Sequence, residues 1–239
     1  VTGACRAFCA GMDLNAAADN AFGLSEHLQP TLDDMRERSD QDDIKNGVRD
    51  SGGLVVLAMY DCKKPIIGAI NGAAVGIGAT MACAMDIRLA SEKAKVGFVF
   101  NKIGITPEAC SSWFLPRLVG IQTALEWCYT AEILTAETLL KERFVKAIYA
   151  PEELLNEAYA LAARMVNFSQ VSMALTRQMI YRNSAQDHPV KAHQVDSLAV
   201  FYASQTSGKE GVNAFLEKRA AKFTEKASSD MPPFYPWWE

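Results

Sequence analysis

The most distinctive hydrophobic pattern is an uncharged segment that covers residues 65–85. Ile66, Ile67 and Ile70 are followed by a turn rich in glycine and alanine, and then by small residues that favour a helix. This order predicts a buried strand, a tight turn and a helix. The first backbone N–H groups of such a helix have no partner within it, so they can stabilise a negative charge at the end of the strand.

Other structures are compatible with parts of this segment. An uncharged run of this length also fits a transmembrane helix, but its four glycines and Asn71 make a poor helix and no second span follows. A dinucleotide-binding turn requires the pattern G-x-G-x-x-G, whereas Gly72, Gly76 and Gly78 give G-x-x-x-G-x-G. From this segment alone, a packed strand, turn and helix without a function remains the simplest alternative.

The rest of the chain divides into a mixed part and a helical part. We predict a helix over residues 54–61, strands over 87–90 and 96–100, and mainly helices after that, including one over 151–168. A further helix is expected to begin at Thr106, with Pro107 at its first position and Glu108 in its first turn. The polar, charge-dense stretch between Asp13 and Asp50 is expected to be poorly ordered in part.

Composition narrows the class of protein. The 239 residues carry a net charge of −4 and no long basic run, so nucleic acid is a poor candidate ligand. The six cysteines form no C-x-x-C pair and have no nearby histidine at metal-binding spacing, so we expect no metal site and a reducing, cytoplasmic location. No signal peptide is visible, and the C-terminal residues 236–239 do not form an organelle address. Val1-Thr2-Gly3 has the pattern of a strand end, and we expect the natural chain to extend upstream of it.

Two glycine-rich blocks together carry a specific resemblance. Residues 8–13 read F-C-A-G-x-D, and residues 71–76 read N-G-x-A-x-G within a block that continues to Asp86. Both resemble the crotonase superfamily, the enoyl-CoA hydratases and isomerases, and the resemblance continues to about Phe223. It implies an α/β fold with a crotonase-like ββα spiral core over residues 1–130. A C-terminal α-helical trimerisation region would occupy residues 131–239, in a homotrimer or hexamer.

The resemblance also implies an acyl-CoA thioester substrate and no further cofactor. The backbone N–H groups of Met12 and Ile77 are expected to hold the thioester oxygen while an enolate forms, which lowers the barrier to proton removal. Alternatively, these amides only cap their turns. The remaining substrate-binding candidates are Ala10, Gly11, Gly76, Phe100, Trp113, Arg6, Lys218 and Lys222. The three basic residues are candidates for the CoA phosphates, with Lys218 and Lys222 on a last helix over residues 217–223; a solvated basic face is the alternative.

Glu108 is the candidate acid and base. The hydratases of this family use two glutamates, and the matching positions here are Thr80 and Phe100, neither of which transfers protons at neutral pH. Residues 104–113 resemble the loop of peroxisomal-type Δ3,Δ2-enoyl-CoA isomerases that carries a single catalytic glutamate, and Glu108 matches it. An acid in a first helical turn is also ordinary dipole complementation. If Glu108 is the base, burial among aromatic side chains, Phe98, Phe100 and Trp113, is expected to raise its pKa.

The predicted activity is therefore movement of the double bond of a 3-enoyl-CoA to the 2-position. Hydration of a 2-enoyl-CoA, or another acyl-CoA reaction of the superfamily, becomes the better interpretation if a second acid such as Asp33 or Asp34 reaches the pocket. A scaffold that binds acyl-CoA without turnover is an alternative of a different class. The residues do not decide the acyl chain length.

Overall fold

The computed structural model describes residues 1–13, 20 and 22–238, and it divides into two compact units. The first unit contains Val1–Tyr60 and Ile67–Asn156, and the second contains Asp61–Ile66 and Glu157–Glu239. The sequence-based division lies at residue 130. The first unit extends beyond it because two later strands, β6 (Ile133–Thr135) and β7 (Ala147–Tyr149), pair with strands of its sheets.

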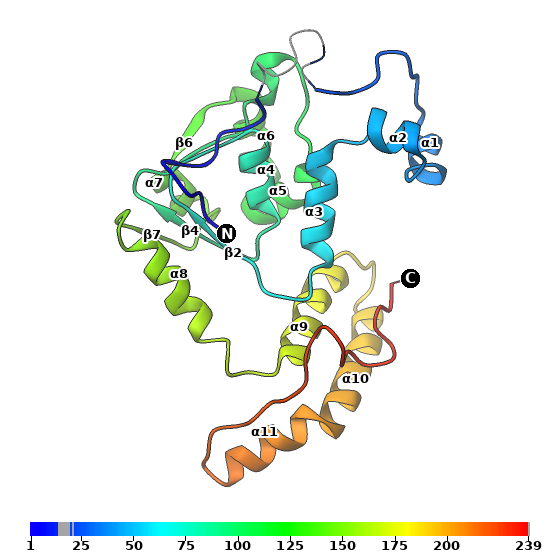
Figure 1. The fold of residues 1–239 in the computed structure, drawn as a ribbon, viewed down its shortest axis with the longest axis vertical. Coiled ribbons are helices and arrows are strands. Elements are labelled where there is room, and N and C mark those ends of the chain that lie inside the picture. The colour runs from blue at the N-terminus through cyan, green and yellow to red at the C-terminus, as the bar shows by residue number, and fades with distance from the viewer. Residues whose placement is uncertain (14–19, 21, 239) are drawn as a thin grey trace. The chain divides into compact units, whose positions relative to one another are not determined.

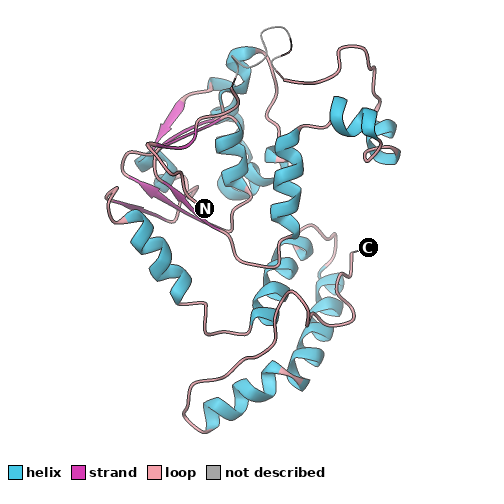
Figure 2. Cartoon of the chain, viewed as in Figure 1, coloured by secondary structure: helices cyan, strands magenta, loops and turns pink. Residues whose placement is uncertain are grey.

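The first unit is built on two small sheets (Figures 1 and 2). One sheet has the strand order β1-β3-β5-β6, and β1, β3 and β5 are parallel while β6 is antiparallel to β5. The other has the order β2-β4-β7 with all strands parallel. The strands not yet delimited are β1 (Ala7–Cys9), β2 (Ile67–Ile70), β3 (Ala73–Val75), β4 (Ile87–Ser91) and β5 (Lys95–Gly97).

The uncharged segment forms the centre of this unit. β2 and the helix α4 (Ile77–Cys83) confirm the predicted strand and helix, but the glycine-rich stretch between them also contains β3. Successive strands therefore enter different sheets, and α4 follows directly after β3. Ile70, Ala74 and Ala79 are completely buried, as expected for an apolar run that is covered on both faces.

Further helices in the first unit are α1 (Leu32–Glu37), α2 (Asp42–Gly47), α3 (Ser51–Asp61), α5 (Ser111–Val119), α6 (Ile121–Thr130) and α7 (Ala136–Lys141). An aromatic cluster holds part of the core: the ring of Phe98 stacks on Trp127 at 6.1 Å and meets the edge of Phe144 at 6.2 Å. Phe98 and Phe144 are completely buried. Such rings contribute both apolar area and favourable ring geometry.

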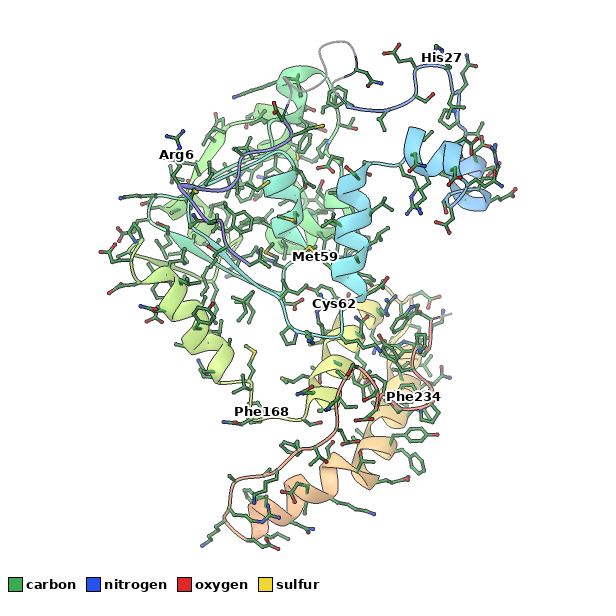
Figure 3. The ribbon with its side chains drawn as sticks, viewed as in Figure 1. Arg6, His27, Met59, Cys62, Phe168 and Phe234 are labelled. Atoms are coloured by element: carbon green, nitrogen blue, oxygen red, sulfur yellow. The ribbon has the colours of Figure 1, made fainter. Side chains whose placement is uncertain are left out.

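The second unit is helical. It contains α9 (Gln170–Asn183), α10 (Pro189–Gln205) and α11 (Ser207–Leu216), and α8 (Leu154–Ala163) begins at the end of the first unit. The aromatic C-terminal segment, with Phe234 labelled in Figure 3, packs on a small core of Val171, Leu175 and Ala199. The buried guanidinium of Arg177 donates to the carbonyl of Cys62 at 2.6 Å, which attaches segment Asp61–Ile66 to α9.

Several expected elements differ from the observed ones. The strand expected over 96–100 is β5 followed by a 3-10 helix (Val99–Ile103), and α8 is shorter than the helix expected over 151–168. No helix covers residues 217–223, because α11 ends at Leu216 and Lys218 has a left-handed backbone with φ of 55°. In the polar stretch, residues 14–19 and 21 lie outside the described residues, and the remainder contains α1 and α2. None of the helices described is long and apolar enough to span a membrane.

Candidate active site

Two glycine turns meet at one edge of the first sheet. β1 and β3 are parallel neighbours, so their carboxyl ends, and the turns that follow them, lie at the same edge. A β-carbon built on Gly76 would lie 3.8 Å from Cα of Gly11, and one built on Gly78 would collide with the carbonyl of Cys9. Gly11 has φ of 101° and Gly76 has φ of 58°, a region that favours glycine. Glycine therefore permits both the backbone conformation and the close approach.

Each turn presents one N–H group directly after its glycine. Met12 follows Gly11, and Ile77 follows Gly76 as the first residue of α4. Among the residues that the structure describes, neither N–H group has a hydrogen-bond acceptor. Unpaired donors at the start of a helix and beside a sheet edge have the chemistry needed to receive an oxyanion.

Glu108 lies in a loop, and the helix expected to begin at Thr106 begins instead at Ser111. Ala109 and Cys110 both have left-handed backbones, with φ of 53° and 54°, which is uncommon for residues other than glycine. The amide and hydroxyl of Ser111 both donate to the carbonyl of Glu108, at 3.0 and 2.7 Å. Dipole complementation in a first helical turn therefore does not account for Glu108, and the loop gives its backbone a defined position.

The Glu108 carboxyl is half-buried and contacts two other elements. The hydroxyl of Thr80, on α4, donates to Oε1 at 2.7 Å. Gly52, in the first turn of α3, lies against the other oxygen, because a β-carbon at Gly52 would collide with Oε2 of Glu108 and with Cδ1 of Ile77. Thr80, which the resemblance matched to an acid of the hydratases, therefore donates a hydrogen bond to the Glu108 carboxyl.

Asp50 is a second acid at this site, and sequence reasoning missed it. It directly precedes α3, and its Oδ1 accepts from the N–H of Gly53 and, at 3.3 Å, from the N–H of Ala109. The acceptance from the residue three positions later is the pattern of a helix N-cap. The sequence D-S-G-G before an apolar run could have identified the cap, but it contains no sign that the cap also reaches the residue next to Glu108.

The surroundings raise the pKa of Glu108 to about 7, from an ordinary value of 4.5. Burial is the main cause, and a hydrogen bond to Asp50 and the negative charge of Asp50 raise the pKa further, while the hydrogen bond from Thr80 lowers it. The sequence predicted that burial would raise the pKa of Glu108. Of the aromatic side chains expected around it, Phe98 packs in the cluster with Trp127 and Phe144. A carboxyl with this pKa can both accept and donate a proton near neutral pH.

The other candidates lie in different environments. Arg6 and Ala10, beside the first turn, are exposed, and the Arg6 side chain projects outward (Figure 3). Phe100 is buried in the 3-10 helix, and the ring of half-buried Trp113 lies under Arg117 at 3.9 Å. Lys218 and Lys222 belong to the second unit.

The acids suggested as partners are engaged in local contacts. Asp33 forms an ion pair with Arg36, and Asp34 closes the capping box of α1 with Thr31. Of the basic candidates for the CoA phosphates, Lys222 donates its backbone N–H to the carboxylate of Glu210. No cluster of three or more metal-binding side chains occurs in the described part of the chain.

Comparison with known proteins identifies the family. The profile described as Enoyl-CoA hydratase/isomerase matches residues 1–226. The chain belongs to this family. The crystal structure of an enoyl-CoA hydratase from Bacillus anthracis has 26% sequence identity and a TM-score of 0.75, over 93% of this chain and 79% of that one. The predicted crotonase fold is therefore confirmed, with its two small sheets and C-terminal helices.

Curated relatives of this hydratase/isomerase chain carry both kinds of name. Enoyl-CoA hydratase AFT3-1 of Alternaria alternata is 42% identical over 180 residues, which are 74% of this chain and 60% of that protein. The chain thus spans less than two thirds of that relative. The 1,2-epoxyphenylacetyl-CoA isomerase of Escherichia coli is 31% identical over 95% of this chain and 80% of its own. The family implies an acyl-CoA substrate, and these relatives do not carry the name Δ3,Δ2-isomerase that the Glu108 loop suggested.

Proposed function

We propose that the protein moves the double bond of a 3-enoyl-CoA to the 2-position, with Glu108 as its acid and base. The observation that carries the proposal is the Glu108 carboxyl itself, half-buried, held by Thr80 at 2.7 Å and with its pKa raised to about 7. The positions of the family's two hydratase glutamates contain Thr80 and Phe100. Neither of those positions carries a carboxyl, so the proposal assigns both proton transfers to Glu108.

The reaction needs one base that returns the proton it takes. The carboxylate of Glu108 removes a proton from C2, and the electron pair of that bond moves onto the thioester oxygen to give a dienolate. The N–H groups of Met12 and Ile77 stabilise the oxygen, and one such donor typically contributes on the order of 10²–10³ in rate. Protonated Glu108 then gives the proton to C4, and the double bond forms between C2 and C3. No water is consumed.

The remaining assignments of the substrate site are part of the same proposal. Ala10, Gly11 and Gly76 would line the thioester, and Phe100 and Trp113 the acyl chain. Exposed Arg6 is the candidate for a CoA phosphate beside the first turn. Lys218, Lys222 and assembly into a homotrimer or hexamer are proposed from the resemblance to the family.

Hydration of a 2-enoyl-CoA is the second candidate. Asp50 lies beside Glu108 and gives the site two carboxyls, which is the number that activation of water and handling of the α-proton require. The hydratase names of relatives such as AFT3-1 also favour it. Asp50 is exposed, however, and its carboxylate already accepts from two backbone amides, which hold it at the start of α3 instead of leaving it free to activate water.

The test compares the rates of the full chain on 3-enoyl-CoA and 2-enoyl-CoA substrates, before and after Glu108→Gln. We expect turnover of the 3-enoyl-CoA that falls by on the order of 10²–10⁴-fold in the variant, while binding of CoA persists. Glu126→Gln, an exposed glutamate on α6, is the control and should leave the rate unchanged. Turnover of the 2-enoyl-CoA alone would establish a hydratase, and no turnover of either substrate would establish a scaffold.

A further inference from the structure

Asp50 and Glu108 approach each other from separate elements. Asp50 precedes α3, and Glu108 precedes α5. Oδ1 of Asp50 accepts from the N–H of Ala109, the residue after Glu108, at 3.3 Å. Gly52, two residues after Asp50, lies against Oε2 of Glu108. The two carboxyls therefore lie close together next to the first turn of α3. The other oxygen of Glu108, Oε1, accepts from the hydroxyl of Thr80.

The environments of the two acids differ in a way that separates their charges. Asp50 is exposed and its carboxylate accepts from two backbone amides at the N-terminal end of an 11-residue helix, and all of these features favour its negative charge. Glu108 is half-buried, and among the described residues the hydroxyl of Thr80 donates to its carboxyl. When two neighbouring carboxyls hold one proton, that proton resides on the less solvated acid. Asp50 should therefore carry the charge and Glu108 the proton.

We propose that Asp50 is a positioning residue for Glu108: its fixed carboxylate accepts a hydrogen bond from protonated Glu108 and keeps that carboxyl between Thr80 and the first turn of α3. The proposal rests on the proposed role of Glu108 as acid and base. The contact with Asp50, at the start of α3, favours the protonated form of Glu108. That form is the one that must return a proton to the substrate. Asp50 itself transfers no proton to substrate.

Other titratable groups near the pair add little charge. Two thiols interact electrostatically with Glu108: that of Cys110 in the same loop and that of Cys83 on α4. Burial raises the pKa of each thiol, that of Cys83 to about 12, so both are neutral near pH 7. Asp50 is therefore the charged partner that these contacts assign to Glu108 within the described residues.

The experiment follows the carboxyl carbons of Glu108 and Asp50 by ¹³C NMR during a pH titration of the full chain without substrate. Glu108→Gln identifies the glutamate signal. In the unaltered protein we expect the Glu108 signal to titrate with a midpoint near its raised pKa of about 7, and the Asp50 signal to show a smaller step at the same pH. Absence of that step at Asp50 would overturn the proposal without recourse to any variant.

Two substitutions test the contact directly. Asp50→Asn and Asp50→Ser both replace the carboxylate by a neutral side chain that can still cap α3. The midpoint of Glu108 should fall in both, although not to its ordinary value, because burial is the larger cause of the raised pKa. Asp42→Asn, at an exposed position in the first turn of α2, is the matched control and should leave the midpoint unchanged. An unchanged midpoint in the two Asp50 variants would show that Asp50 only caps α3.

Activity separates this proposal from the proposed function. With 3-enoyl-CoA, Asp50→Asn should lower kcat and shift the acid limb of the kcat/KM profile to lower pH while KM stays constant. A loss confined to KM, with the pH profile unmoved, would contradict the positioning role. If the unaltered protein turns over no 3-enoyl-CoA but the NMR midpoint still shifts, the isomerase function fails and the Asp50–Glu108 contact stands.

Discussion

The hydroxyl of Thr80 donates to Oε1 of Glu108 at 2.7 Å, although 28 positions separate the two residues in the chain. The contact joins α4, which begins at the second glycine turn, to the loop before α5. A hydrogen bond to the charged form of an acid stabilises that form. The hydrogen bond from Thr80 therefore lowers the pKa of Glu108, against the rise that burial causes, and favours the ionised carboxylate near neutral pH.

Replacement of Thr80 by valine should raise the pKa of Glu108 above about 7. Valine has the same shape but cannot donate, and loss of a hydrogen bond to a charged group is worth on the order of 1.5 kcal/mol, or about one pKa unit. The acid limb of the kcat/KM profile should then shift to higher pH by roughly that amount. Thr80→Ser keeps the donor and should leave the limb in place; an unmoved limb in Thr80→Val would contradict the assignment.

Glu108 should also make the stability of the protein depend on pH. Its pKa is about 7 in the folded state and about 4.5 when unfolded, so between these values the folded state binds more protons. The free energy of unfolding should therefore fall as pH rises through this window, and stay lowered above it. Urea unfolding of the protein and of Glu108→Gln at about pH 4.5 and about pH 8 measures the effect.

The glutamine variant has no such titration, so its stability relative to the unaltered protein should increase with pH across the window. Groups that do not contact Glu108 titrate equally in both proteins and cancel in the difference. A difference that is the same at both pH values would show that the pKa of Glu108 is close to its ordinary value.

Gly52→Ala should reduce activity by displacing the Glu108 carboxyl. The new β-carbon would collide with Oε2 of Glu108 and Cδ1 of Ile77, and both are ends of flexible side chains that can move aside. Stability should therefore change little, while kcat falls by on the order of 10²-fold because proton transfer depends on position. Gly211→Ala, in helix α11 with only ordinary contacts at 3.8 Å, is the control and should leave kcat unchanged.

Gly78→Ala should affect both stability and activity. Its β-carbon would collide with the carbonyl of Cys9, a backbone atom that cannot move without separating the two glycine turns. Overpacking of this kind typically costs about 1–3 kcal/mol. Thermal unfolding checks the stability, and the rate with 3-enoyl-CoA should fall more steeply than the stability alone explains. Full activity in a folded Gly78→Ala variant would argue against a role for the paired turns.

Much of the first unit follows from local sequence. The apolar run at residues 66–70 and the small residues after Gly76 predict β2 and α4 because strand and helix preferences are properties of short segments. The strand β3, in the glycine-rich stretch, was not predicted, since its three residues carry no clear alternation. It forms because β1 and β5 pair with it on either side. Local preference also failed at Thr106, where typical helix-start residues precede a loop.

The sequence by itself determined the family, the two glycine turns and Glu108 as the candidate base, because these depend on residue types at fixed spacing within short blocks. Only the tertiary structure decided what surrounds that carboxyl. Thr80 lies 28 positions away, and Asp50 bonds to the amide of Ala109 across 59 positions. The proton affinity of Glu108 depends on burial and on neighbouring charge, which act through space, so folding brings them together and no local pattern contains them.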